Sequence, residues 1–320
     1  MERIITVLGL TKQYDNLIAV DHINFEVSEG EIFGFLGPNG ASKTSTIRML
    51  TGLSQPNEGM ASVLGHDLKN GFALAKKGFG VVPEISNLYD ELSALENLVF
   101  IAQLYGVPRP KRVKKAEELL ELFGLSEKRD ARFHTLSRGM KRTLTIAAAL
   151  IHEPQLLFLD EPTTGLDVMH ARSLRSLIRQ LNKRGVTIFL TTHYLEEADL
   201  LCDRIAILVR GRIVALDTPE NLKMAAEEEP ACEVSFSPML ADAASELKKE
   251  PGISGVVEVG SKLRLCGDKA SIALQAALRY AEVNGLEIRA ANLVKPSLED
   301  AFVKLTGLST EVMLAEKGGK

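Results

Sequence analysis

The stretch EIFGFLGPNGASKTSTIRML, Glu31 to Leu50, decides the fold of this chain. Its residues 32–36 are an apolar run that predicts a buried strand. A glycine-rich turn, Gly37 to Gly40, follows, and Lys43-Thr44 opens a segment of helical character. These are the parts of a phosphate-binding loop, because amides at a helix start point at a polyphosphate, the lysine reaches its outer phosphates and the hydroxyl binds Mg²⁺. An ordinary glycine turn between a strand and a helix is the alternative for this stretch alone.

Length and composition limit the class of protein. A chain of 320 residues suggests about two domains. The net charge of −4 and a pI of about 6.0 leave no dominant basic surface, so we do not expect nucleic acid as a partner. Three distant cysteines, Cys202, Cys232 and Cys266, suggest neither a disulfide framework nor a zinc site, which fits a reducing cytoplasm.

The hydrophobic runs of this chain are short. None approaches the roughly 18 residues that a membrane-spanning helix needs. We therefore predict no direct membrane insertion, and a role at a membrane would require a partner.

A second apolar run, Leu156 to Leu159, ends in two adjacent acids, Asp160 and Glu161. This pattern predicts a buried strand that delivers carboxylates to the edge of a sheet where ligands bind in α/β proteins. An aspartate at that place holds Mg²⁺ in phosphate-loop enzymes, and a following carboxylate can activate water. Alternation along a strand predicts that the two acids lie on opposite sides. A strand that simply ends in charged residues is the alternative.

Further candidates have a structural and a functional interpretation each. Ser137 and Gly139 precede an apolar helix, where they can cap the helix or offer amides to an anion. His193 follows the predicted strand 186–191, either as a structural residue or as a sensor of a γ-phosphate. Tyr14 is either a half-buried strand residue or an aromatic face on which adenine stacks.

Taken in order, these motifs resemble the ATP-binding subunits of ATP-binding cassette (ABC) transporters over about residues 2–225. Tyr14 matches the adenine-stacking aromatic, GPNGASKT the Walker A loop and LSRGM, Leu136 to Met140, the signature. LLFLDEPT matches the Walker B strand with its catalytic glutamate. Glu84, Asp167 and His193 stand at the Q-loop, D-loop and switch positions.

The resemblance implies a P-loop NTPase cassette with a mixed sheet over 1–226, including a helical subdomain at about 86–140. Two cassettes, expected to be a homodimer, would sandwich two ATP molecules, each between one chain's Walker motifs and the other's signature. Lys43, Glu161 and His193 would be catalytic, and Mg²⁺ would be held by Thr44, Asp160 and Glu84. The implied nucleotide-binding residues are Tyr14, Gly37, Pro38, Asn39, Gly40, Ala41, Ser42, Lys43, Thr44, Ser45, Glu84, Ser137, Gly139 and Asp167.

Three positions depart from the family pattern. Glu84 replaces a glutamine, although either side chain can reach metal or water through an oxygen. Arg138 replaces the first glycine of the signature. Ser42 replaces the last glycine of Walker A, so its side chain can cap its own helix and compete with phosphate. Backbone strain there would cost about 1–3 kcal/mol, or about five- to 150-fold in ATP affinity. We expect ATP binding to be weakened but retained.

Residues 231–307 change character and predict the order βαββαβα, a small ferredoxin-like α+β domain. The ending KPSLEDAFVKLTG, Lys295 to Gly307, is similar to the C-terminal extension of type-2 ABC exporter ATPases, whose permease is a separate polypeptide. We expect a regulatory or dimer-contact role for this domain, with a small-ligand sensor as the alternative. Residues 308–320 are predicted to be a flexible tail.

The resemblance thus implies an ATPase on the cytoplasmic face of the membrane, powering export through a separate permease, including drug or antibiotic efflux. A degenerate cassette that hydrolyses weakly or not at all is the alternative that Ser42 favours. A soluble cassette ATPase of translation or DNA repair is a further alternative. The single cassette and the lack of a heptad run argue against it.

Overall fold

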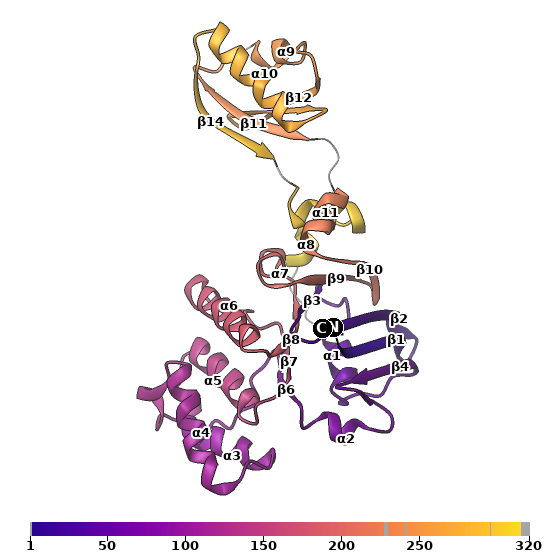
Figure 1. The fold of residues 1–320 in the computed structure, drawn as a ribbon, viewed down its shortest axis with the longest axis vertical. Helices are drawn as coiled ribbons and strands as arrows, with labels where there is room; N and C mark the ends of the chain where they lie inside the picture. The colour runs from indigo at the N-terminus through magenta and orange to yellow at the C-terminus, as the bar shows by residue number, and fades with distance from the viewer. Residues whose placement is uncertain (1, 227–229, 241, 295, 315–320) are drawn as a thin grey trace. The chain divides into compact units, whose positions relative to one another are not determined.

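The structure, a computed structural model, describes residues 2–226, 230–240, 242–294 and 296–314. The chain divides into two compact units, Met1–Pro219 with Leu305–Lys320, and Glu220–Lys304 (Figure 1). The unit boundary at 219/220 lies before the predicted domain end at 226. Each unit is described separately below.

The first unit is built around a six-stranded sheet in the order β10-β9-β3-β8-β7-β6. Strands β9, β3, β8, β7 and β6 run parallel and β10 is antiparallel to β9. The strands are β3 (Ile32–Leu36), β6 (Phe79–Val82), β7 (Leu156–Asp160), β8 (Thr187–Thr192), β9 (Arg204–Val209) and β10 (Arg212–Asp217). Every residue of β3, β7 and β8 is buried, as expected for central parallel strands covered on both faces.

A second sheet of the same unit is antiparallel, in the order β2-β1-β4-β5. Its strands are β1 (Arg3–Tyr14), β2 (Leu17–Ser28), β4 (Glu58–Val63) and β5 (His66–Asp67). Its inner face packs on the first sheet through aromatic side chains. Phe25 of β2 lies 5.5 Å from Phe33 and 4.9 Å from Phe35, both in β3. This dry aromatic core fixes the strand that leads into the glycine-rich loop.

Helices α5 (Arg138–Leu150) and α6 (Val168–Lys183) lie on the other side of the six-stranded sheet (Figure 1). Helices α1 (Lys43–Leu50) and α2 (Phe72–Ala75) lie on the side of the antiparallel sheet and pack into the core that the two sheets share. Helix α7 (Leu195–Leu201) follows β8. Between β6 and α5 lie α3 (Ala94–Leu104), α4 (Arg109–Leu122) and the 3₁₀ turns Ser126–Lys128 and Phe133–Thr135. These pack around their own apolar cluster, which includes Leu98, Leu120 and Leu144. The predicted mixed sheet with a helical subdomain is confirmed.

The apolar pattern predicts helices at 144–151 and at about 171–184, and both helices begin earlier than that. Helix α5 starts at Arg138 because Ser137 caps it, accepting a hydrogen bond from the Met140 amide at 3.3 Å. Helix α6 starts at Val168 because Asp167 caps it, accepting from the His170 amide at 3.0 Å. Polar caps lie outside an apolar repeat, so the repeat alone places each start too late.

The second unit contains a four-stranded antiparallel sheet in the order β12-β13-β11-β14. Its elements are β11 (Ala231–Ser237), α9 (Ala243–Leu247), β12 (Ile253–Val259), β13 (Lys262–Gly267), α10 (Ala270–Val283) and β14 (Glu287–Val294). In the chain, helix α8 (Pro219–Ala226) precedes these elements and helix α11 (Leu298–Thr306) follows them. The order β-α-β-β-α-β with this strand order is a ferredoxin-like arrangement.

The segment predicted to be a flexible tail is partly helical. Residues Glu311–Leu314 form the short helix α12, with Met313 buried. The flexibility of residues 308–320 stays a prediction. Residues 315–320 lie outside the described residues.

Candidate functional site

The loop between β3 and α1 has the backbone of an anion-binding site. The Ala41 amide donates to the Pro38 carbonyl at 3.1 Å, which closes a tight turn. The first helical bond of α1 runs from the Thr46 amide to the Ser42 carbonyl, so the amides of residues 43–45 form an unpaired first turn. A Cβ on Gly37 would lie 2.4 Å from the Leu208 carbonyl oxygen. Only glycine fits there.

Ser42 lies at the N-cap of α1 with φ 78° and ψ 23°, in the left-handed region. Its side chain makes no capping hydrogen bond. The expected competition between a serine cap and phosphate for the same amides is therefore wrong. What this position carries is backbone strain, about 1–2 kcal/mol for a residue with a Cβ in this conformation.

Lys43 is buried beside the acid that follows β7. Its Nζ donates to the carbonyl oxygens of Gly37 at 2.6 Å and Pro38 at 3.1 Å. It also lies 3.0 Å from Glu161 Oε1, and both side chains are 6% exposed. The other carboxylate oxygen, Glu161 Oε2, lies 2.8 Å from His193 Nδ1. Three of the predicted residues, from the ends of α1, β7 and β8, thus form one contact chain.

Asp160 faces a different set of partners. Its Oδ1 accepts from the Thr191 hydroxyl at 2.6 Å and from the Thr44 hydroxyl at 3.3 Å. Oxygens about 3 Å apart fit two adjacent positions of an octahedral Mg²⁺, whose ligands lie 2.0–2.1 Å from the metal. Thr44 and Asp160 therefore fit a magnesium ion.

Glu161 leaves the strand with φ 49°, a left-handed conformation. Its amide bonds to the Thr191 carbonyl at 3.1 Å. The two acids do have different partners, as predicted. The reason differs from simple strand alternation, because β7 ends at Asp160 and the backbone turns at Glu161.

The two carboxylates have opposite pKa shifts. Burial alone would raise the pKa of Glu161, but the His193 hydrogen bond and the Lys43 charge outweigh it and lower the pKa to about 2. Burial raises the pKa of Asp160 against the hydrogen bonds from Thr191 and Thr44, and the nearby acids add to the rise. Magnesium binding would favour the ionised form of Asp160.

The signature segment and the 164–170 segment contact each other within the chain. A Cβ on Gly139 would lie 2.5 Å from the His170 ring, and the His170 ring pairs with Asp167 at 2.5 Å. Arg138 donates to the Thr164 carbonyl at 3.5 Å. Ser137 has the capping role described above. The 164–170 segment meets the contact chain at Thr164, whose hydroxyl donates to Glu161 Oε2 at 3.2 Å.

Two other predicted residues, Tyr14 and Glu84, have contacts with Lys12 and Arg142. Tyr14 ends β1 with 42% of its surface exposed, and the Lys12 ammonium lies 5.1 Å from its ring centroid. Glu84 follows β6, and its backbone carbonyl accepts from Arg142 at 3.3 Å. The charge of Glu84 helps to raise the pKa of Asp160, but its effect is smaller than those of burial and of the two hydrogen bonds.

Sequence reasoning missed two buried charged residues. Arg142 on α5 is 6% exposed, and burial lowers its pKa to about 10. Glu197 on α7 is 1% exposed, and burial raises its pKa against the hydroxyls of Thr192 and Thr163. Arg142 lies one turn after Gly139 and one turn before buried Ile146, so helical periodicity would have placed it on the buried face.

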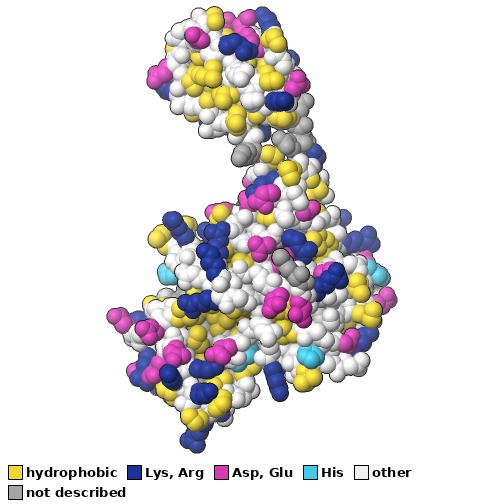
Figure 2. All heavy atoms as spheres, in the orientation of Figure 1, with side chains coloured by type: hydrophobic (Ala, Val, Ile, Leu, Met, Phe, Trp, Pro, Cys, Tyr) yellow, Lys and Arg dark blue, Asp and Glu magenta, His cyan; other side chains and the backbone are white. Residues whose placement is uncertain are grey.

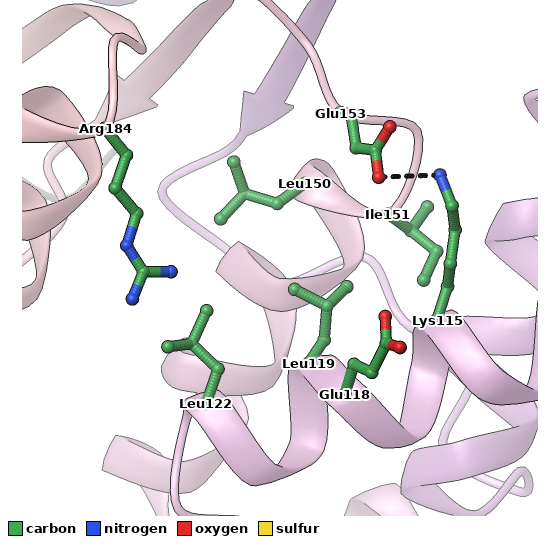
Figure 3. Close-up of a pocket in the computed structure, with 8 residues that line it drawn as sticks. All are labelled: Lys115, Glu118, Leu119, Leu122, Leu150, Ile151, Glu153 and Arg184. Atoms are coloured by element: carbon green, nitrogen blue, oxygen red, sulfur yellow. Dashed lines mark ion pairs between the residues drawn. The ribbon is translucent and has the colours of Figure 1, made fainter.

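Two surface hollows are lined by residues outside the contact chain. A groove of about 350 Å³ lies between α4 and the end of α5, with a Lys115–Glu153 ion pair of 2.9 Å across it (Figure 3). None of the predicted nucleotide-contacting residues lines it. The second unit has a hollow of about 600 Å³ beside the β12–β13 turn. Its lining includes Phe236, Lys262 and Arg289.

The surface carries charges of both signs. On the face in Figure 2, Lys and Arg side chains are interspersed with Asp and Glu. Among the described helices, none is both long enough and apolar enough to cross a membrane.

Comparisons with known proteins identify the family of this chain. A family model described as ABC transporter matches residues 20–164. The chain is 41% identical to Nod factor export ATP-binding protein I of Mesorhizobium japonicum, covering 95% of this chain and 86% of the relative. It is 36% identical to the daunorubicin/doxorubicin resistance ATP-binding protein DrrA of Streptomyces peucetius, covering 95% and 93%.

A solved structure with the same fold is cbiO1 of Clostridium perfringens, part of the ABC transporter complex cbiONQ. It aligns with a TM-score of 0.65 and 28% identity, over 71% of this chain and 93% of that one. None of these comparisons supports the alternative of a degenerate cassette.

Proposed function

Since this chain belongs to the ABC transporter family as one of its ATP-binding ATPase subunits, we propose that Lys43, Glu161 and His193 form its hydrolytic centre. We propose further that the energy drives export through a separate membrane permease. The single observation that carries the proposal is the contact chain from Lys43 through Glu161 to His193. The Thr44–Asp160 pair lies beside it on the same loop and strand.

Each residue of the centre has its own task. The amides of residues 43–45 and the Lys43 ammonium bind the phosphates of ATP. Glu161 accepts a hydrogen bond from the attacking water, and His193 holds that carboxylate in place. Mg²⁺, held by Thr44 and Asp160, supplies charge neutralisation at the phosphate oxygens. Glu84 is a further candidate for contact with the metal or with water.

The Lys43–Glu161 ion pair has a consequence for the order of events. An acid with a pKa of about 2 is a weak base, because the hydrogen bond from His193 and the Lys43 charge stabilise its ionised form. A polyphosphate that draws Lys43 away from Glu161 removes part of this stabilisation. Substrate binding therefore raises the basicity of Glu161 at the moment when a base is needed.

The remaining nucleotide contacts come from Tyr14, from the other residues of the 37–45 loop and from a second copy of the chain. Tyr14 stacks on the adenine. The loop residues Gly37, Pro38, Asn39, Gly40, Ala41, Ser42 and Ser45 surround the phosphates. A second copy of the chain completes the site, with Ser137 and Gly139 of one cassette meeting the nucleotide on the other, and with Asp167 at the contact between the cassettes.

The transport assignment draws on the relatives. Both are named as ATP-binding proteins, one of Nod factor export and one of daunorubicin/doxorubicin resistance. We propose that this chain likewise sits on the cytoplasmic face of a membrane and serves an exporter of drugs or of other small molecules. The second unit, residues 231–307 in the proposed domain division, takes a regulatory or dimer-contact role.

The test uses inside-out membrane vesicles from cells that express a candidate permease. Purified chain is added with MgATP, and its binding to the vesicles and its phosphate release are measured, with vesicles lacking the permease as the control. We expect binding and faster phosphate release only with the permease. Equal binding and equal rates with both kinds of vesicle would refute the transport role.

A further inference from the structure

Arg142 joins two backbone segments on either side of the proposed centre. Its Nη2 donates to the Asp160 carbonyl at 2.8 Å and its Nε to the Pro162 carbonyl at 2.9 Å. Its Nη1 donates to the Glu84 carbonyl at 3.3 Å and also to the Pro83 carbonyl. One guanidinium thus binds four carbonyl oxygens from residues that flank Glu161 and Glu84.

A second side chain of α5 supports the same segment. Thr145, one turn after Arg142, is 2% exposed. Its hydroxyl donates to the Lys141 carbonyl at 2.8 Å and forms a hydrogen bond with the Ser86 hydroxyl, also at 2.8 Å. Two side chains of α5, Arg142 and Thr145, therefore contact the 83–86 segment. Of the two, Arg142 also contacts the segment that follows β7.

Arginine is the residue type that this arrangement requires. The planar guanidinium presents five donors in a rigid fork, so it can serve acceptors on two sides at once. A lysine has three donors on one atom and cannot span both segments. The cation also lies among the charges of Asp160, Glu197, Glu84 and Glu161, which stabilise it against the effect of burial.

We propose that Arg142 is a positioning residue of the hydrolytic centre, which fixes the segment carrying Glu84 relative to the segment carrying Asp160 and Glu161. This inference deepens the proposed function and rests on it. Within the part of the chain that the structure describes, Arg142 donates hydrogen bonds to backbone carbonyls, so it acts through these carboxylates. The four carbonyl groups that accept from Arg142 lie outside the 37–45 loop. We therefore expect phosphate binding not to depend on Arg142.

The test compares Arg142→Lys with two other variants. Thr145→Val removes the Ser86 contact and a hydrogen bond to the Lys141 carbonyl within α5, and it leaves Arg142 in place. Arg112→Lys is the matched control, because Arg112 on α4 also donates to a backbone carbonyl, that of Val107 at 2.7 Å, away from the site. Hydrogen exchange is followed by mass spectrometry in the full chain, together with kcat and KM for MgATP.

In Arg142→Lys we expect exchange to rise about tenfold in residues 84–90 and 160–166, with α1 unchanged, because local stability is lost there alone. Of these two segments, Thr145→Val should raise hydrogen exchange in residues 84–90 only. Arg112→Lys should raise it in neither segment. We expect kcat of Arg142→Lys to fall about 10- to 100-fold while KM stays within about threefold, since orientation and not binding is lost.

Two results would overturn the inference. One is unchanged exchange in both segments of Arg142→Lys, and the other is a rise that includes α1 equally, which marks general destabilisation. If Arg142→Lys does not fold, Arg142→Gln, whose amide has two donors, replaces it in the same comparison with the same expected results. A wild-type chain that releases no phosphate refutes the proposed function, whereas the exchange pattern still decides the role of Arg142.

Discussion

Replacing Glu161 by glutamine is expected to tighten the binding of a non-hydrolysable ATP analogue. In the structure Lys43 Nζ lies 3.0 Å from Glu161 Oε1 with both side chains nearly excluded from water. A phosphate must compete with that carboxylate for the same ammonium. Glu161→Gln removes the charge and leaves a neutral amide of similar size, so Lys43 becomes available to the ligand.

The size of the effect follows from the lost interaction. A hydrogen bond to a charged group contributes about 1.5–3 kcal/mol. Because the ligand no longer has to displace it, affinity should rise about 10- to 150-fold. The assay is a calorimetric titration with the Mg²⁺ complex of the analogue, which removes turnover from the measurement. Glu196→Gln, the same change at an exposed acid 3.6 Å from Arg175, is the control and should bind as wild type does.

A competing explanation is that Glu161 simply repels the phosphate. Lys43→Met separates the two explanations, because repulsion persists without the lysine and competition does not. In the Lys43→Met background we expect Glu161→Gln to raise the affinity for the analogue less than about threefold, since coupled residues give non-additive effects. Our reasoning fails if wild type and Glu161→Gln bind equally, or if the gain is the same in both backgrounds.

Three further predictions concern stability. Ser42→Gly relieves the left-handed strain at φ 78° and should raise the free energy of unfolding in urea by about 1 kcal/mol after the entropy of glycine is subtracted; a less stable variant would contradict this. The raised pKa of Glu197 means that the native state holds its proton more tightly, so stability is lost as pH rises through that pKa. Urea titrations should therefore find Glu197→Gln more stable than wild type at pH 8 but not at pH 4, and an equal gain at both would exclude this cause. Gly139→Ala should cost about 1 kcal/mol or less, because the exposed His170 ring can turn away and alanine favours the helix, and His170→Ala should recover this loss in a double-mutant cycle; full additivity would exclude that contact.

The positions of the main strands were predictable because their sequences allow few alternatives. The apolar run 32–36 matches β3 in full, and LLFLD matches β7. The carboxyl ends of parallel neighbours meet at one edge of a sheet. This is why Lys43, Asp160, Glu161 and His193 could be expected together although they are far apart in sequence.

The conformations of single residues in the site were not predictable. Glu161 and Ser42 both have positive φ values, which residues with a Cβ rarely adopt without support from their surroundings. The sequence shows that Ser42 replaces a glycine, but it does not show whether the hydroxyl caps the helix. The structure shows that it does not.

Arg142 illustrates a second limit. Its position on the buried face of α5 can be inferred from periodicity, whereas its four acceptors come from two segments brought together only by the sheet. A hydrogen bond between distant segments leaves no local pattern in the sequence. Such residues are found from the structure.

The central claim is that Lys43, Glu161 and His193 form an ATPase centre with magnesium held by Thr44 and Asp160. The most direct measurement is steady-state phosphate release by the purified chain from ATP, with and without Mg²⁺, in wild type and Glu161→Gln. We predict Mg²⁺-dependent release that falls at least about 100-fold in Glu161→Gln, since general base catalysis contributes about 10²–10⁴-fold. Equal rates in wild type and variant, or equal rates with and without Mg²⁺, would contradict the account.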